Sequence, residues 1–204
     1  MFQTFDDISD PGSGPARLKA LQAELVRRGL DGFLVPRSDE HQGEYVPPSA
    51  ERLKWLTGFS GSAGIAVVLK HRAAIFVDGR YTLQVRDQVD TEAFEPRHLI
   101  TEGWDKWLEE HLWADARLGY DPWLHTVAGV RRLEKVAETT GAVLVPVTEN
   151  AVDAVWTDRP APPLGEVVVQ SETHAGRSAA DKISEIQETL AKARADATVL
   201  TQPD

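Results

Sequence analysis

Residues 38–45, Ser-Asp-Glu-His-Gln-Gly-Glu-Tyr, gather one imidazole and three carboxylates. Such a group suggests an acid–base pair or a lone metal site. Only one histidine is present, however, and no other histidine lies at ligand spacing. A polar surface loop is therefore the favoured interpretation, and a loop that faces another domain or subunit is a third one. The polar stretch 37–50 is long for a connection, and long ordered loops in compact domains are often functional.

A second group, Asp78-Gly79-Arg80-Tyr81, begins a predicted helix directly after a predicted strand. Asp78 is of a type that caps helix N-termini, and Gly79 would allow the turn. Arg80 either forms a bidentate pair with a carboxylate or serves only the local structure, and both interpretations stay open.

The glycine-rich stretch Thr57–Gly64 invites comparison with a phosphate-binding loop, because glycines let backbone N–H groups approach an anion. It contains no Gly-Lys-Ser/Thr, and the segment that follows reads as a strand, whereas phosphate binding uses a helix N-terminus. A structural bend beside the sheet is the favoured interpretation.

No motif of a catalytic centre is evident, because the Gly-x-Ser-x-Gly and His-Glu-x-x-His patterns are both absent. His125 precedes a predicted helix without a partner in the local sequence and is interpreted as structural. We therefore predict neither catalytic nor metal-binding residues in this chain. The tryptophans are interpreted as core residues, with an aromatic interface as the alternative. They are Trp55, Trp104, Trp107, Trp113, Trp123 and Trp156.

Composition excludes several classes of protein. Of the 204 residues, 42% are hydrophobic and 26% are charged, which is typical of a globular chain. The net charge of −10 argues against partners that need a basic face, such as nucleic acid and anionic membranes. Cysteine is absent, so neither disulfides nor thiolate metal sites form. Residues 1–7 do not resemble a secretory signal. We expect a cytoplasmic protein.

Helical and strand patterns alternate along the first 158 residues, which predicts an α/β domain with a mixed β-sheet flanked by helices. The two apolar runs 65–69 and 73–77 are joined by a short turn, so we expect an antiparallel hairpin. The predicted helices are 15–28, 51–56, 80–89, 104–112, 127–137 and 150–156. The other predicted strands are 32–35, 94–100, 117–120 and 143–147.

The Pro-rich stretch 159–163 is the best linker in the chain and is assigned, with the extended residues up to 177, as a stiff connection. After it, Ile183, Ile186 and Leu190 predict one helix, and Ala197–Leu200 predicts a buried strand. A strand of that kind needs neighbours on both edges. We therefore expect residues 178–204 to be the first helix and strand of a truncated second domain. No internal repeat is apparent in the sequence.

Several segments, taken together and in order, resemble the N-terminal part of long-form Xaa-Pro aminopeptidases (aminopeptidase P) of the creatinase and prolidase superfamily. The segments are 39–45, 56–64, 78–84, 119–126, 150–156 with Arg159-Pro160, and 175–178. The resemblance implies two related α/β domains of creatinase type, followed by a C-terminal metallopeptidase domain. That last domain holds two divalent metal ions, usually manganese, on Asp, Glu and His ligands, none of which exists in this chain.

The resemblance also implies a function. The intact family enzyme removes the N-terminal residue from peptides whose second residue is proline, and its metals polarise the carbonyl and supply the nucleophile. The part at hand would be non-catalytic and would help shape substrate access and the contacts of a homodimer. We expect five residues to lie near the substrate or at an interface: Asp39, His41, Phe59, Arg80 and Tyr81. The alternative is a stand-alone α/β binding module without catalysis.

Overall fold

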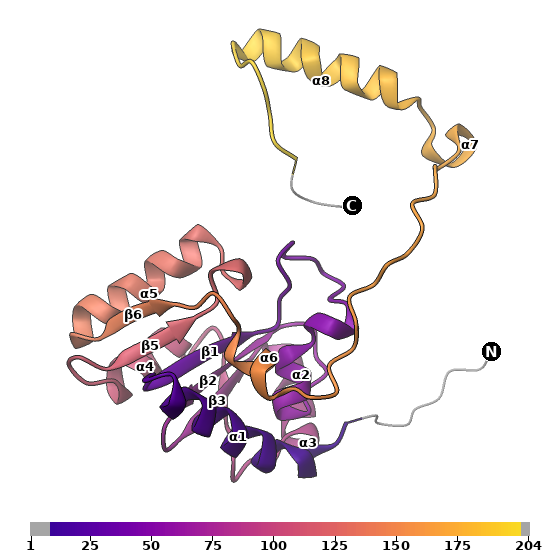
Figure 1. Ribbon diagram of the computed structural model, residues 1–204. Coiled ribbons are helices and arrows are strands. Elements are labelled where there is room, and N and C mark those ends of the chain that lie inside the picture. Colours follow the sequence, from indigo (N-terminus) through magenta and orange to yellow (C-terminus); the bar gives the residue numbers. More distant parts are fainter. Residues whose placement is uncertain (1–8, 201–204) are drawn as a thin grey trace. The chain divides into compact units, whose positions relative to one another are not determined.

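The computed structural model describes residues 9–200, and the chain divides into two compact units at Pro162–Pro163. Figure 1 shows both units, each of which is described by itself. The interpretation of residues 1–7, and the last four residues of the expected second domain, lie outside the described residues. No helix within the described residues is long and apolar enough to cross a membrane.

The first unit is built on a six-stranded sheet with the order β4-β3-β2-β1-β5-β6. Its strands are β1 Gly32–Pro36, β2 Gly64–Leu69, β3 Ala73–Val77, β4 Glu95–His98, β5 Arg117–Tyr120 and β6 Val143–Pro146. β2 is antiparallel to both of its neighbours, while the β1–β5, β3–β4 and β5–β6 pairs are parallel. All strands except β2 therefore run in one direction. The mixed sheet and the predicted β2–β3 hairpin are confirmed.

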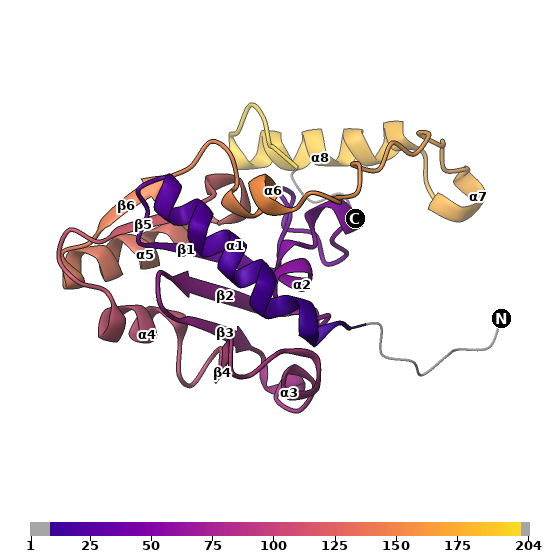
Figure 2. The ribbon, with the colours of Figure 1, turned by 60° about the horizontal axis from the view of Figure 1, so that its bottom comes forward.

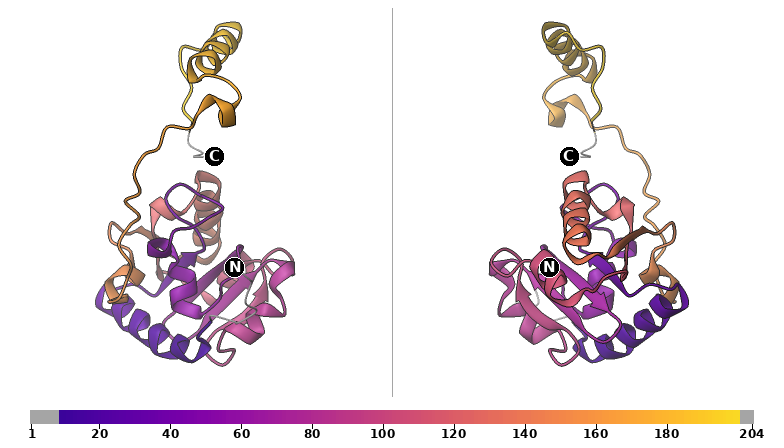
Figure 3. Two further views of the ribbon diagram at one scale, coloured as in Figure 1. Left: turned by 90° about the vertical axis from the view of Figure 1, so that its right-hand side faces the viewer. Right: turned by 90° about the vertical axis from the view of Figure 1, so that its left-hand side faces the viewer.

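Helices cover both faces of this sheet. On one face pack α1 Gly14–Arg27, α2 Arg52–Thr57, α3 Gln84–Gln88 and α6 Ala151–Val155. On the other pack α4 Trp104–His111 and α5 Val127–Thr140. Figure 2 shows α1 lying across one face of the sheet, and Figure 3 shows α1 along the outside of the first unit. Leu21 and Leu25 of α1 are fully buried there. Short 3₁₀ turns complete the unit at Pro11–Ser13, Pro48–Ala50, Gly79–Tyr81 and Pro122–Leu124.

The predicted helix 80–89 is wrong as one element. The structure has a 3₁₀ turn at Gly79–Tyr81 and a separate short helix, α3. The hydroxyl of Tyr81 lies 2.7 Å from Ser62 Oγ, which holds this residue against the bend that precedes β2. That tether keeps the chain close to the sheet and interrupts the helix. Ser13 precedes α1 as predicted, but its hydroxyl donates to Asp10 O at 3.0 Å instead of capping the helix.

Both edge strands carry a proline, Pro96 in β4 and Pro146 in β6. In β6, the N–H groups of Val143 and Val147 donate toward β5, to Ala116 O and Tyr120 O. Because N–H direction alternates along a strand, position 146 faces the free edge, where proline has no donor. This arrangement discourages an added strand at the β6 edge.

The second unit contains α7 Glu172–Ala175 and α8 Ala179–Ala193. The predicted helix is confirmed, and Ser178 Oγ caps it by accepting from Asp181 N at 3.1 Å. The predicted strand 197–200 is wrong for this chain, since these residues form no strand. A strand needs a partner edge, and the described residues of this unit contain no other strand. Residues 164–170 are exposed and form neither helix nor strand.

Candidate functional site at the carboxyl edge of the sheet

The strand directions bring distant segments of the chain to one edge of the sheet. The parallel strands all end there, and β2, which runs the other way, begins there. Arg37 N donates to Gly64 O at 3.0 Å, and Asp78 N donates to Ala63 O at 3.4 Å. The segments 37–50, 58–63, 78–81 and 121–126 therefore meet at this carboxyl edge. Ligands of open α/β sheets bind at such an edge.

The Asp78–Tyr81 turn presents a guanidinium at this edge. Asp78 Oδ1 accepts from Arg80 N at 3.0 Å and from Arg80 Nε at 2.8 Å. The predicted capping role of Asp78 is confirmed, although it caps a 3₁₀ turn. Arg80 is paired, but through a single carboxylate oxygen and not as a bidentate fork. The hydrogen bond from Arg80 lowers the pKa of Asp78, and the same bond raises the pKa of Arg80. The Arg80 side chain is 68% exposed.

Tyr81 and Phe59 form the support beneath Arg80. The Arg80 guanidinium lies 5.2 Å from the centre of the Tyr81 ring, and the Tyr81 and Phe59 rings meet edge to face at 5.6 Å. The hydrogen bond with Ser62 lowers the pKa of the Tyr81 hydroxyl. Phe59 is 1% exposed, so it supports the other residues and offers no surface to a ligand.

Asp39 and His41 belong to the loop that follows β1. Asp39 is buried, and its Oδ1 accepts from His41 N and Gly43 N, both at 3.0 Å. This carboxylate therefore shapes the loop and does not face solvent. The imidazole of His41 is 64% exposed, with Glu40 Oε1 at 3.8 Å. The structure thus brings Phe59, Arg80 and Tyr81 into contact, while the contacts of Asp39 and His41 are with their own loop.

Two amides at the centre of the glycine-rich bend are already bonded. Phe59 N donates to Thr57 Oγ1 at 3.1 Å, and Ser60 N donates to Gln88 Oε1 at 2.9 Å. A phosphate loop needs such amides free to meet the anion. The structural interpretation of the bend is therefore supported, and its role is to place Phe59 and Ser62.

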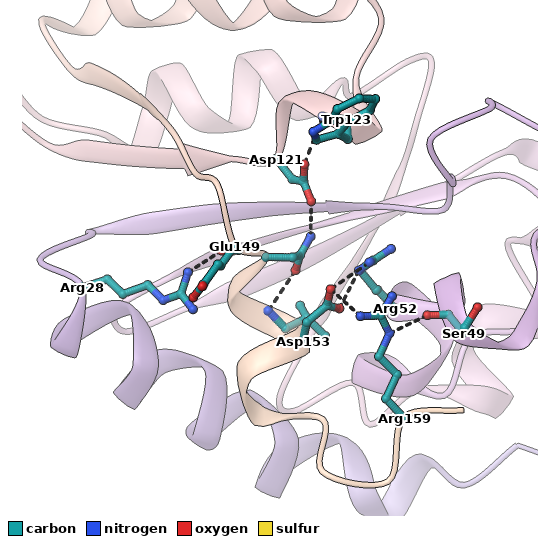
Figure 4. Close-up of polar contacts among 10 residues, drawn as sticks. Arg28, Ser49, Arg52, Asp121, Trp123, Glu149, Asp153 and Arg159 are labelled. Atoms are coloured by element: carbon teal, nitrogen blue, oxygen red, sulfur yellow. Dashed lines mark hydrogen bonds and ion pairs between the residues drawn. The ribbon is translucent and has the colours of Figure 1, made fainter. Parts of the chain in front are cut away.

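A polar network beside this edge was missed by sequence reasoning (Figure 4). Asn150 Nδ2 donates to Asp121 Oδ2 at 2.9 Å, which joins the end of β5 to the start of α6. One turn later, Asp153 accepts from Arg52 Nε at 2.7 Å and from Arg52 Nη2 at 2.9 Å. Arg159 Nη1 also reaches Asp153, at 2.7 Å. The Asp-Pro-Trp and Asn-x-x-Asp patterns were visible in the sequence, but nothing local in it points to Arg52 or Arg159 as the partners.

The remaining residues singled out in the sequence are His125 and the tryptophans. His125 packs edge to face on Tyr120 at 5.8 Å, and burial lowers its pKa. Trp104, Trp107 and Trp156 are buried as predicted, whereas Trp123 is 73% exposed. Trp123 lies beside a cleft of about 420 Å³ that Asp121, Asn150 and Asp153 also line.

The groups exposed at this edge could bind a polar ligand. Arg80 and His41 present exposed polar groups, but no proton relay joins them. Within residues 9–200 no three His, Asp or Glu side chains are grouped so that they could hold a metal ion. The described residues therefore do not provide the ligands that a two-metal centre needs.

Two family models match the sequence, both described as the creatinase/prolidase N-terminal domain, over residues 17–155 and 158–204. Aminopeptidase P1 of Lotus japonicus is 38% identical over 189 residues, which cover 92% of this chain and 29% of the relative. A probable Xaa-Pro aminopeptidase P of Aspergillus flavus is 37% identical, with the same coverage of 92% and 29%. The chain therefore spans less than a third of the length of these relatives.

Solved structures agree with these matches. The X-prolyl aminopeptidase of Caenorhabditis elegans, described as a cytosolic enzyme with a di-nuclear active site, matches with a TM-score of 0.82 and 29% identity. That match covers 91% of this chain and 32% of the enzyme. The N-terminal domain of the cytoplasmic peptidase PepQ of Mycobacterium tuberculosis matches with a TM-score of 0.53 and 25% identity, over 69% of this chain and 98% of that domain. The resemblance seen in the sequence is thereby confirmed, and the chain belongs to the creatinase/prolidase N-terminal domain family.

Proposed function

We propose that this chain is the N-terminal, non-catalytic region of a metal-dependent Xaa-Pro aminopeptidase, a hydrolase that removes the N-terminal residue from peptides with proline second. The observation that carries the proposal is the match over 92% of the chain to relatives that bear this name. The acidic composition, with a net charge of −10, is consistent with peptide substrates rather than nucleic acid or membranes as partners.

The metal centre of the whole enzyme belongs elsewhere in this proposal. The C. elegans structure is described with a di-nuclear site, and the match covers only 32% of that enzyme. Two divalent ions, which we propose are manganese, would be held by another region of the whole enzyme and not by residues 9–200. We further propose a cytoplasmic homodimer.

Within that enzyme, we propose that the carboxyl edge of the sheet faces the substrate entrance or a second subunit. Arg80 and His41 are both exposed enough to touch a peptide. Tyr81 and Phe59 hold the guanidinium in place, and Asp39 holds the turn that presents His41. The roles are therefore divided between contact residues and supporting residues.

We also propose that residues 178–204 begin a second domain of the same fold. Aligned without a gap, residues 178–200 of the second unit repeat the pattern of residues 13–35, which form α1 and β1. Ser178, which directly precedes α8, corresponds to Ser13, which directly precedes α1, and three apolar residues of α1 correspond to three of α8. The matched apolar pairs are Leu18 with Ile183, Leu21 with Ile186, and Leu25 with Leu190.

The backbone supports the same alignment. Gly29, which ends α1, has φ +66°, and Arg194, at the corresponding position after α8, has φ +54°. The apolar residues 197–200 then correspond to β1. Leu21 is fully buried by the sheet in the first unit, whereas Ile186 is 37% exposed. The stripe on α8 therefore has the pattern of a helix that a sheet would cover.

The contact roles predict a kinetic effect in a full-length enzyme that contains this region. Arg80→Ala or His41→Ala should lower kcat/KM for an Xaa-Pro peptide by about 5- to 150-fold, since a lost charge-assisted hydrogen bond costs about 1–3 kcal/mol. Steady-state kinetics with a fluorogenic Xaa-Pro peptide measures it. Arg132→Ala is a matched control, because Arg132 is also exposed and paired with one aspartate. Kinetics and dimerisation that match this control in both variants would contradict the proposed contacts.

A further inference from the structure

A hydrogen bond links the last turn of the loop 37–50 to Arg159, the residue that precedes the Pro-rich segment. Arg159 Nε donates to Ser49 O at 2.7 Å, across more than a hundred residues of sequence. Ser49 is buried, so this carbonyl is not satisfied by bulk water. The loop's beginning is held separately, by Ser38 Oγ donating to Leu124 O at 2.9 Å. Arg159 is therefore the side chain that holds the far end of the loop.

Arg159 is itself held in place by Asp153. The Asp153 carboxylate pairs with Arg159 Nη1 at 2.7 Å and with the buried Arg52, whose helix α2 follows the loop directly (Figure 4). Because one carboxylate orients both guanidiniums, Arg159 has little freedom to turn away from Ser49. The planar fork of arginine makes this possible, since Nε and Nη1 donate in different directions from one rigid group.

The segment after Arg159 is stiff. Its sequence is Pro160-Ala161-Pro162-Pro163, and Pro-rich segments hold an extended conformation over several residues. The direction in which such a segment leaves the first unit depends on how its first residue is fixed. Arg159 thus links two segments: the stiff Pro-rich segment follows it in the sequence, and the loop that carries Asp39 and His41 is hydrogen-bonded to it through Ser49.

We propose that Arg159 is a positioning residue that couples the loop 37–50 to the departing Pro-rich segment. A change in the direction of that segment would move the Ser49 end of the loop, and a fixed segment would hold the loop in its binding geometry. The coupling itself is a property of the first unit. Its consequence for turnover rests on the proposed function.

Hydrogen exchange on the 204-residue chain tests the coupling. The reporter is the amide of Ala50, which donates to Pro47 O at 2.8 Å in the last turn of the loop. In Arg159→Ala we expect exchange at Ala50 to become about five- to tenfold faster, because the charge-assisted bond that fixes this turn is lost.

Two further variants separate a tether from a general stabilising charge. Arg159→Lys keeps a cation near Asp153 but lacks the fork, so we expect the same acceleration at Ala50 as in Arg159→Ala. Arg132→Ala removes an ion pair of the same 2.7 Å length elsewhere in the unit and should leave Ala50 unchanged. Unchanged exchange at Ala50 in Arg159→Ala would overturn the proposal. Equal acceleration at Ala50 in Arg132→Ala would also overturn it, because Arg159 would then only stabilise the whole unit.

Kinetics of the longer enzyme tests the consequence. Arg159→Ala and Arg159→Lys should both raise KM for an Xaa-Pro peptide relative to Arg132→Ala, as expected for a displaced binding loop. Faster exchange at Ala50 together with unchanged KM would contradict the position of the loop at the substrate entrance, and so the proposed function, while leaving the tether intact.

Discussion

Arg52→Ala should lower the free energy of unfolding of the first unit by about 1.5–3 kcal/mol, the cost of losing hydrogen bonds to a charged group inside the protein. The Arg52 side chain is 8% exposed and the Asp153 side chain 24% exposed, and their two hydrogen bonds join α2 to α6. Without Arg52, the Asp153 carboxylate keeps only Arg159 as a charged partner. Urea unfolding followed by tryptophan fluorescence measures the loss.

The matched control for this variant is Arg132→Ala. The Arg132 side chain is 53% exposed and pairs with Asp105 at 2.7 Å, so its loss should cost about 0–1 kcal/mol. A cost below about 1 kcal/mol for Arg52→Ala, equal to that of the control, would show that the α2–α6 pair does not hold the unit together.

Gly58→Ala should be the second severe change, at about 2–5 kcal/mol. Gly58 ends α2 with φ +86°, and a Cβ there would lie 2.5 Å from the backbone oxygen of Gln88. The left-handed conformation costs a residue with a Cβ about 1–2 kcal/mol, and the clash adds about 1–3 kcal/mol because backbone cannot move aside cheaply. The bend that carries Phe59 and Ser62 should be displaced as a result.

Gly29→Ala separates the two costs. Gly29 also has a left-handed φ, +66°, but no atom lies within 4 Å of the added Cβ. It should therefore lose only the conformational part, about 1–2 kcal/mol. Equal losses of stability in the two variants, measured by the same urea unfolding, would contradict the close approach of Gly58 to Gln88.

Local signals predicted the framework of the first unit. The apolar runs 65–69 and 73–77, separated by a short polar turn, were sufficient for the β2–β3 hairpin, and the predicted strand 32–35 is β1, Gly32–Pro36. The parallel direction of the β3–β4 and β5–β6 pairs follows from the helices between them, whereas β1 and β2 are antiparallel although α2 lies between them. The helix 80–89 failed because Tyr81 is bonded to Ser62, a tertiary contact with no local sign.

The candidate site was harder to predict, because side-chain direction is decided by packing. Phe59 sits in a polar, glycine-rich stretch that reads as exposed, yet Gly61 leaves the space that its ring fills: a Cβ on Gly61 would lie 2.3 Å from Phe59 Cζ. Asp39 reads as one of several loop carboxylates, yet it alone of these is buried. The strand 197–200 failed for a different reason, since the pattern predicts a buried strand but cannot supply its partners.

Peptide cleavage by the chain itself tests the central claim, that its carboxyl edge serves recognition and not catalysis. The purified 204-residue chain is incubated with a fluorogenic Xaa-Pro peptide, with and without added manganese. We expect no release of the N-terminal residue above the buffer rate in either case, because the described residues bring together no metal-binding group of His, Asp or Glu. Metal-dependent turnover that survives repurification of the chain would contradict this account.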